Sequence, residues 1–560
     1  MALRVPKSSY PQLFKDGYKN IQGVDEAVLR NIQAIHELTE IVRTSFGKNK
    51  MVINHLEKLF VTNDATTIIR ELEVVHPAAK LLVMASQQQE QEVGDATNFV
   101  MIMAGELLQK AEYLLRMGLH PSEIIQGYEI ARDKVSEILQ EFCIESVKDL
   151  KSPKELSKAV KTTISSKQYG NEDILTPLVI EAAHLVMPKN PQNFNVDNIR
   201  VVKVMGSSIH ESRVVKGMVF GREPEGIVRK VNNGKIAVFT CPLDLTQTET
   251  KGTVLIHNAK EMLNFTKGEE HHMEKVFKEL ADADIKVVVT GSSIGELALH
   301  YLNRFNIMVV KVLSKFDLRR LCKVLDANAL ARLGVPTPEE MGYCDIVETV
   351  EIGGDRVTVF RQENETTKTA TIIIRGATQN HLDDIERAID GGINIVKAIG
   401  RDNRLVPGAG ATEMELLKQL VTFEIFPRTI AENSGLDATK VLAKLYSIHY
   451  NADIAAGTTT TKITKGSDTT IDDVEGCKDE SQDAKNYNRL IGVDIENEED
   501  GGGVCNVVEK GILDCYASKL WAIKFATDAA LTVLRVDQII MSKPAGGPKA
   551  PKQNPNWDED

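Results

Sequence analysis

The chain has 560 residues, 42% of them hydrophobic and 26% charged, which predicts a globular protein of two to four domains. Its net charge of −12 argues against general binding to nucleic acids or anionic membranes, because both favour basic surfaces. Seven scattered cysteines form no CxxC pair, which disfavours a zinc site or disulfide framework and suits a reducing compartment. We see no signal peptide and no run of about 18 apolar residues, so we expect a cytoplasmic protein without membrane spans.

The N-terminal third has the periodicity of amphipathic helices. Apolar residues at i, i+3 and i+4 predict helices over 24–46, 77–115 and 121–142, the second broken at Gly94 and Asp95. Residues 151–183 predict two further helical runs, separated by a polar loop over 162–170.

Sequence patterns typical of strands dominate from about residue 198. The predicted elements of this middle part are strands at 199–204, 236–240, 254–256, 285–289 and 307–312, a charged helix at 260–282 and a helix at 294–304. The last two strands and the helix between them form a β-α-β unit, which is typical of a parallel sheet. The charged helix is expected to project from this part.

The remaining chain returns to helices. The predicted elements are a buried strand at 371–375, helices at 383–400, 436–450 and 521–534, a glycine-rich loop with its helix over 405–420, and a strand at 536–541. Residues 458–483 are rich in Thr, Asp and Lys and predict a flexible insertion. Residues 543–560 are rich in Pro, Gly and Lys and predict a disordered tail.

Three short motifs, far apart in the sequence, each resemble a turn that enters a helix. They are Val61–Thr67 (VTNDATT), Gly94–Asn98 (GDATN) and Leu405–Glu413 (LVPGAGATE). Helix N-termini attract anions, and Asp beside Thr at such a place can hold Mg²⁺ while N–H and hydroxyl groups hold phosphate. A site divided in this way predicts a helical domain built from both parts of the chain, with a smaller linking domain and an α/β domain inserted between them.

Each motif also has a simpler interpretation. An Asp before a helix is most often only an N-cap, which applies to Asp64. Gly408 and Gly410 alone favour a helix-entry turn, and Lys167 alone favours a solvated lysine. The order and combination of the motifs favour the phosphate-binding interpretation for Asp95 and Gly410, and less firmly for Asp64.

Longer stretches resemble the group II chaperonins over nearly the whole chain. These stretches are 54–58 (NHLEK), 71–79 (ELEVVHPAA), 194–200 (FNVDNIR), 216–220 (KGMVF), 249–254 (ETKGTV), 317–322 (DLRRLC) and 536–551 (VDQIIMSKPAGGPKAP). The last stretch is similar to one particular subunit type of the eukaryotic cytosolic chaperonin TRiC.

The resemblance implies a multidomain α and α/β protein with the chaperonin fold. The implied parts are an α-helical equatorial domain over 1–149 and 405–542, a small intermediate domain over 150–214 and 370–404, and an α/β apical domain over 215–369. A helical protrusion of the apical domain falls within 246–282 and forms part of a lid.

The resemblance further implies the partners and the chemistry. Paralogous subunits form a hetero-oligomeric double ring of eight subunits per ring, which uses ATP and Mg²⁺ and encloses unfolded clients such as actin and tubulin. It implies no nucleic-acid and no membrane partner.

Carried over residue by residue, the family's site falls on both parts of the chain. Asp64 orients the attacking water, Asp95 ligates Mg²⁺, Lys167 senses the γ-phosphate, Gly410 approaches ribose and adenine, and Asp514 holds the ribose hydroxyls. The other cofactor-binding positions are Thr44, Gly47, Ala96, Thr97, Asn98 and Gly408.

The sequence departs from the family pattern at four places. The phosphate loop Thr44–Lys50 is about three residues short, and Ala96 replaces the glycine of the GDGT motif. The position of the family's catalytic Asp is Gly391; Asp390, the remaining catalytic candidate, lies one residue earlier, about 100° around a helix. Residues 421–423 run directly into 424–428, where the family has about one more helix, so we expect an exposed apolar face there.

Two interpretations of these departures stay open. The chain is either a ring subunit that has lost ATP hydrolysis and serves a structural or client-contacting role, or the short segments at 47–50 and 421–424 are errors in the gene model. An unrelated ATPase or kinase is disfavoured, because the β-α-β unit lacks both GxxxxGK[ST] and GxGxxG.

Overall fold

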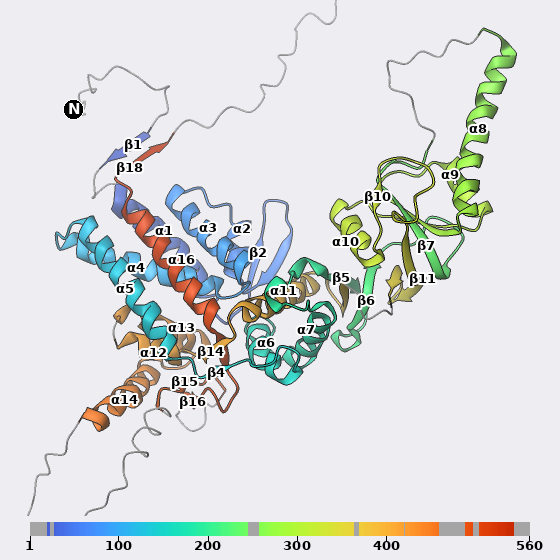
Figure 1. The fold of residues 1–560 in the computed structure, drawn as a ribbon. Coiled ribbons are helices and arrows are strands. Elements are labelled where there is room, and N and C mark those ends of the chain that lie inside the picture. Colours follow the sequence, from blue (N-terminus) through green and yellow to red (C-terminus); the bar gives the residue numbers. More distant parts are fainter. Residues whose placement is uncertain are drawn as a thin grey trace, which may run out of the picture.

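A computed structural model describes residues 19–22, 27–244, 257–362, 369–418, 420–457, 488–496 and 503–541. The chain forms three regions in a row: a helical region, a small middle region, and an α/β region from which one long helix projects (Figure 1). The predicted strand at 254–256, the predicted insertion at 458–483 and the predicted tail lie outside the described residues.

The helical region combines both parts of the chain around one hydrophobic core. Its helices are α1 (Leu29–Arg43), α2 (Ala65–Glu71), α3 (Pro77–Glu92), α4 (Thr97–Arg116), α5 (Pro121–Glu141), α12 (Ala411–Leu417), α13 (Ile425–Ser434), α14 (Ala438–Gly457) and α16 (Tyr516–Leu534). Helix α4 is buried along most of its length, and α16 packs against α3, α4 and α5. The predicted break at Gly94 and Asp95 is confirmed, because α3 ends at Glu92 and α4 begins at Thr97.

Short strands complete this region. They are β1 (Lys19–Gln22) paired with β18 (Gln538–Met541), the hairpin β2 (Lys50–Ile53) and β3 (Leu59–Thr62), β14 (Arg404–Pro407) between β4 (Glu145–Ser146) and β17 (Leu513–Cys515), and β15 (Ile491–Val493) with β16 (Val504–Asn506). All these pairings are antiparallel.

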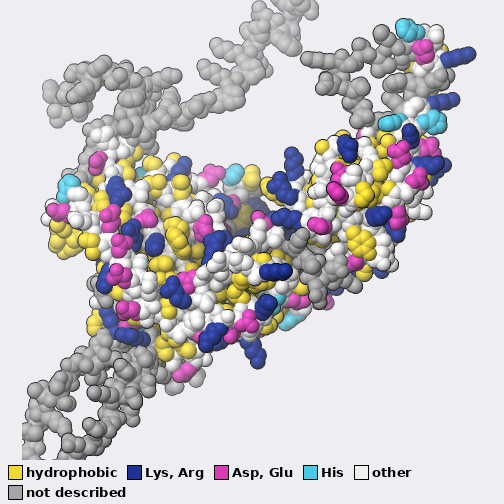
Figure 2. All heavy atoms as spheres, viewed as in Figure 1, with side chains coloured by type: hydrophobic (Ala, Val, Ile, Leu, Met, Phe, Trp, Pro, Cys, Tyr) yellow, Lys and Arg dark blue, Asp and Glu magenta, His cyan; other side chains and the backbone are white. Residues whose placement is uncertain are grey.

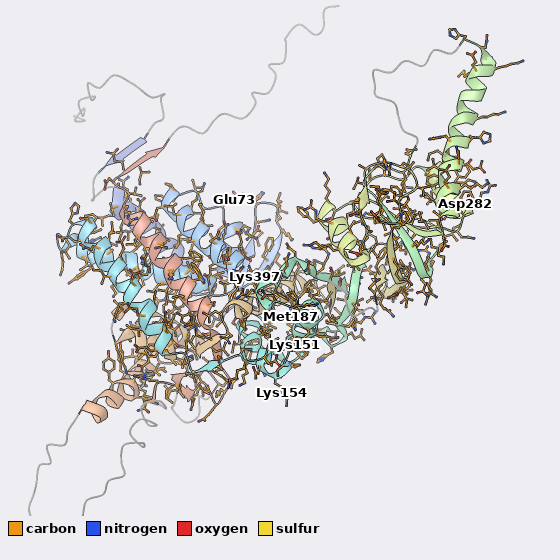
Figure 3. All side chains as sticks on the ribbon, in the orientation of Figure 1. Glu73, Lys151, Lys154, Met187, Asp282 and Lys397 are labelled. Atoms are coloured by element: carbon orange, nitrogen blue, oxygen red, sulfur yellow. The ribbon has the colours of Figure 1, made fainter. Side chains whose placement is uncertain are left out.

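The middle region has its own core. Helices α6 (Pro153–Lys167), α7 (Glu172–Val186) and α11 (Gln379–Arg401) pack with the parallel strands β5 (Ile199–Met205) and β13 (Ala370–Gly376). Every residue of β13 is buried, as the sequence predicts. Figure 3 labels Lys397 of α11, whose amine donates to the carbonyl of Glu92 (3.3 Å) and so ties this region to the end of α3.

The predicted polar loop over 162–170 is wrong for 162–167, because α6 continues to Lys167, and correct for 168–170, which form the turn between α6 and α7. The hydroxyl groups that suggested a loop donate to carbonyls of the helix itself: Thr163 Oγ1 to Ala159 and Ser166 Oγ to Thr163. Thr163 and Ile164 are buried, so packing holds the helix together to its end.

The α/β region continues the same sheet. Its strands are β6 (Arg213–Phe220), β7 (Lys230–Phe239), β8 (Ile285–Thr290), β9 (Met308–Lys311), β10 (Ala329–Leu330), β11 (Gly342–Ile352) and β12 (Asp355–Arg361), and its helices are α8 (Ala259–Asp282), α9 (Glu296–Arg304) and α10 (Lys315–Leu325). The sheet order is β5-β13-β6-β12-β11-β7-β8-β9. The predicted β-α-β unit is confirmed, because β8 and β9 are parallel neighbours. Helix α8 projects away from the sheet, and acidic and basic side chains intermingle on the face in Figure 2.

The short segment before α13 is packed against the core of the helical region. Residues Val421–Glu424 form a 3₁₀ turn, and Phe423 and Phe426 are buried. The Phe426 ring stacks on Phe99 of α4 with centroids 3.9 Å apart. The expected exposed apolar face is therefore not found among the described residues of this junction, because these aromatic rings fill the space.

Candidate functional site

A cavity of about 450 Å³ lies where the helical region meets the end of α6. Its lining residues are Phe46, Gly47, Lys48, Asn63, Asp64, Asp95, Ala96, Thr97, Asn98, Ser166, Lys167, Ile430, Asn433, Ser434 and Ile495. Seven of the predicted site residues thus meet in one place: Gly47, Asp64, Asp95, Ala96, Thr97, Asn98 and Lys167.

Asp64 is both an N-cap and part of the cavity wall. One carboxylate oxygen accepts from Thr67 N (3.0 Å) and Thr67 Oγ1 (2.8 Å), and the other accepts from Thr97 Oγ1 (2.7 Å). Burial alone would raise the pKa of Asp64, but the charge of Lys167 and these hydrogen bonds outweigh it and lower that pKa. Asp64 therefore stays ionised at the junction of α2 and α4.

Asp95 lies in a left-handed turn at the start of α4. Gly94 has φ +77° and Ala96 has φ +62°, so the turn places a non-glycine residue where the backbone favours glycine. Gln89 supports the turn by donating to the Asp95 carbonyl (2.9 Å). Burial raises the pKa of Asp95, and Asp514 and Asp64 raise it further, while Lys167 and a backbone hydrogen bond from Ala96 oppose the change. A cation near Asp95 would stabilise the ionised form of this carboxyl group.

Lys167 ends α6 and reaches across to the helical region. Its amine donates to the carbonyl of Gly94 (3.0 Å). The next residue, Gln168, is buried and donates to Asp384 of α11. Lys167 is thus held from both sides, between the Gly94 turn and the helix pair of the middle region.

Sequence reasoning missed several wall residues. Asn63 Nδ2 donates to the Ser166 carbonyl (2.7 Å), and the Asn63 carbonyl accepts from Asn98 Nδ2 (3.0 Å). Asn98 Oδ1 also accepts from Ala65 N (2.8 Å), so one amide joins α4 to the start of α2. Asn63 adjoins Asp64 and could have been inferred from its motif, whereas Ser166 was assigned to a loop that is helical.

The short phosphate loop reaches the cavity through only part of its length. Gly47, with φ +84°, and Lys48 line the cavity, while Thr44 is exposed and donates to the Ile41 carbonyl of its own helix. Thr44 is therefore not placed at the cavity in this structure.

The third motif forms β14 and the turn that enters α12, outside the lining of this cavity. Gly410, with φ +83°, caps α12, and a Cβ atom there would lie 3.2 Å from the Pro427 side chain. Asp514 forms an ion pair with Lys519 (3.0 Å), and Lys519 also pairs with Glu413. Gly408, Gly410 and Asp514 do not belong to the lining of this cavity, and their contacts to ribose and adenine stay predictions.

A second cavity, of about 350 Å³, adjoins the first and shares Asp64 and Lys167 with it. Both Asp390 and Gly391 line it. A Cβ atom at Gly391 would lie 2.9 Å from Lys167 Nζ, so position 391 faces the lysine. Asp390 lines the second cavity. Desolvation by the surrounding residues, and then the charge of the Glu386 carboxylate, raise the pKa of Asp390 to about 6.

The wall residues of the first cavity fit a magnesium triphosphate. Asp95 and Asp64 supply carboxylate oxygens, Lys167 and Lys48 supply positive charge, and the first turn of α4 has no side-chain cap on its N–H groups. Within the described ranges, no group of three or more His, Cys, Asp or Glu side chains could hold a metal. Mg²⁺ is usually bound by one or two carboxylates together with substrate phosphates and water, a role for which the Asp95 and Asp64 carboxylates are suited.

Comparison with known proteins identifies the family. A model of the TCP-1/cpn60 chaperonin family matches residues 38–544. The chain belongs to this chaperonin family. A search of the described helices finds no candidate membrane span.

The full-length relatives are of one subunit type within the family. The chaperonin chain is 55% identical to the "Probable T-complex protein 1 subunit theta" of Schizosaccharomyces pombe, and 50% and 49% identical to the "T-complex protein 1 subunit theta" of Homo sapiens and of Saccharomyces cerevisiae. Each comparison covers 100% of both chains. The S. pombe comparison extends over 582 positions, more than the 560 residues here, so that relative has residues without a counterpart in this chain.

Proposed function

We propose that this chaperonin subunit binds ATP with Mg²⁺ in the first cavity. The observation that carries the proposal is the meeting of Asp64, Asp95 and Lys167, from three separated segments, around one space of about 450 Å³. In this proposal Asp95 holds Mg²⁺, Lys167 and the N-terminus of α4 hold phosphate, and Gly408, Gly410 and Asp514 face the nucleoside. When bound, Mg²⁺ neutralises phosphate charge.

We further propose the assembly that the relatives' names suggest. The chain is one member of a hetero-oligomeric double ring of eight subunits per ring, located in the cytoplasm, which encloses unfolded clients such as actin and tubulin. Separate hydrophobic clusters in the helical, middle and α/β regions support its division into equatorial, intermediate and apical domains. The projecting helix α8 supports a lid role for the apical protrusion.

A specific observation favours a variant of this function in which the subunit binds ATP but turns it over slowly. Position 391 faces Lys167 and lacks a carboxylate, while Asp390 lines the second cavity instead. Asp64, already hydrogen-bonded to Thr67 and Thr97, keeps its charge near the site. Loss of one preorganised catalytic group costs a factor on the order of 10²–10³ in rate.

Native mass spectrometry of the endogenous protein tests the assembly and the chain together. Sixteen chains of 61.9 kDa give a complex of about 1 MDa. A complex of that size, containing peptides that span 40–55 and 415–430 as written here, supports a ring subunit with an altered site. Peptides that restore longer segments would return the chain to the ordinary ATPase subunits, and a lone monomer would contradict the ring.

A further inference from the structure

Residues beside the two shortened segments, which are more than 370 residues apart in the sequence, line the first cavity together and contact each other. The loop after α1 contributes Phe46, Gly47 and Lys48 to the lining, and α13, directly after the short turn at Val421–Glu424, contributes Ile430, Asn433 and Ser434. The departures at these two places therefore concern one structural unit.

One side-chain amide of α13 contacts both the end of α1 and the loop that follows it. Asn433 Nδ2 donates to the carbonyl of Phe46 (2.8 Å) and to the carbonyl of Arg43 (3.0 Å), which is the last residue of α1. The four last carbonyls of a helix have no partner inside it, so this amide completes the end of α1 from another helix. The same side chain lines the cavity.

Aromatic rings support this amide from behind. Phe426, about two helical turns before Asn433, stacks on Phe99 of α4 (3.9 Å) and lies 6.5 Å from the Phe46 ring. One helix thus contacts both the loop and the helix that carries the Gly94–Asn98 motif. A Cβ atom at Gly47, which has φ +84°, would meet no other atom within 4 Å, so the loop is open at this position.

We propose that Asn433 is a positioning residue of the nucleotide cavity, which holds the short loop at the phosphate end of the site. The amide supplies the fixed geometry for Gly47 and Lys48 that the shortened loop does not supply itself. This inference rests on the proposed function, because it concerns how the same cavity recognises phosphate.

The test compares the full-length chain with Asn433→Ala, using Mg²⁺-ATP, Mg²⁺-tripolyphosphate and adenosine as probes. We expect the affinities for ATP and tripolyphosphate to fall about tenfold, the size expected when hydrogen bonds to a positioned backbone are lost, and the affinity for adenosine to stay within twofold. Amide hydrogen exchange at residues 44–50 should become faster without ligand. A general structural defect would weaken all three ligands alike and would overturn the inference.

Glu432→Gln is the matched control, since it weakens the neighbouring contact of α13 to Arg43 (2.8 Å) but leaves both carbonyls paired with Asn433. We expect wild-type affinities for this variant; an equal loss there would show that any α13 contact suffices and would overturn the role of the amide. Unchanged affinities in Asn433→Ala would also overturn it. If the wild-type chain binds neither ATP nor tripolyphosphate, the proposed function itself fails.

Discussion

The backbone of Gly391 on α11 passes so close to Lys167 that a Cβ atom there would lie 2.9 Å from the lysine amine. That amine instead donates to the Gly94 carbonyl (3.0 Å), at the turn that precedes Asp95. A carboxylate at position 391 would therefore enter the junction between the two cavities, beside the only lysine that both of them share.

Gly391→Asp should raise ATP turnover, by up to a factor on the order of 10²–10³, because it adds a carboxylate where the middle region faces the proposed triphosphate site. Steady-state phosphate release measures the effect. Gly391→Asn has nearly the same shape without the charge and should leave turnover near the wild-type value. Equal rates for all three proteins would remove Gly391 as the cause of slow hydrolysis.

Asp390 should make the free energy of unfolding depend on pH between about 4 and 6. Its folded pKa of about 6 exceeds its unfolded value near 3.8, so the folded state keeps a proton that the unfolded state releases. Asp390 therefore lowers the free energy of unfolding as pH rises through this window, and its effect on that free energy is constant above it. In urea titrations, Asp390→Asn should gain stability relative to wild type from pH 4 to pH 6. A constant difference across that range would contradict the raised pKa.

Ala96→Gly should stabilise the protein by about 1 kcal/mol. Residue 96 has a left-handed backbone conformation, and glycine lacks the Cβ atom that disfavours it. Chemical denaturation followed by circular dichroism gives the value. Ala131→Gly, inside the right-handed helix α5, is the control and should destabilise by about 1 kcal/mol. Changes of the same sign in both variants would show that the φ of Ala96 is not the cause.

Phe426→Ala should lower the free energy of unfolding by about 3–5 kcal/mol, the usual loss for a buried phenylalanine. Phe316→Ala, whose side chain is 73% exposed on α10, should change it by less than about 0.5 kcal/mol. Both values come from the same denaturation experiment. A small effect at Phe426 would mean that the junction after the 3₁₀ turn is not packed.

The fold could be predicted from the sequence wherever one pattern decided the structure. The break at Gly94, the buried strand β13 and the β8-α9-β9 unit follow from glycine, apolar runs and periodicity. The end of α6 was missed because Ser and Thr are compatible with both loop and helix, and only the packing of Thr163 and Ile164 decides between them.

The site was predictable where residues share a motif and not where they meet only through tertiary packing. Asp64, Asp95 and Lys167 were predicted and lie around the same cavity. Asn433 was not, since nothing in the sequence near it indicates that its amide reaches the carbonyls of Arg43 and Phe46. Thr44 was predicted as a ligand, but it is the C-cap of α1 and its hydroxyl donates to the Ile41 carbonyl of that helix.

The packing of α16 against α3, α4 and α5 has a consequence for synthesis on the ribosome. The α/β region uses one continuous part of the chain, so it can fold as soon as β12, ending at Arg361, has emerged. The helical region cannot close its core until Tyr516–Leu534 is available, and until then α4 exposes the surface that α16 will cover. The nascent chain therefore presents an apolar helix for most of its translation, and this chaperonin subunit is itself exposed to aggregation while it is made.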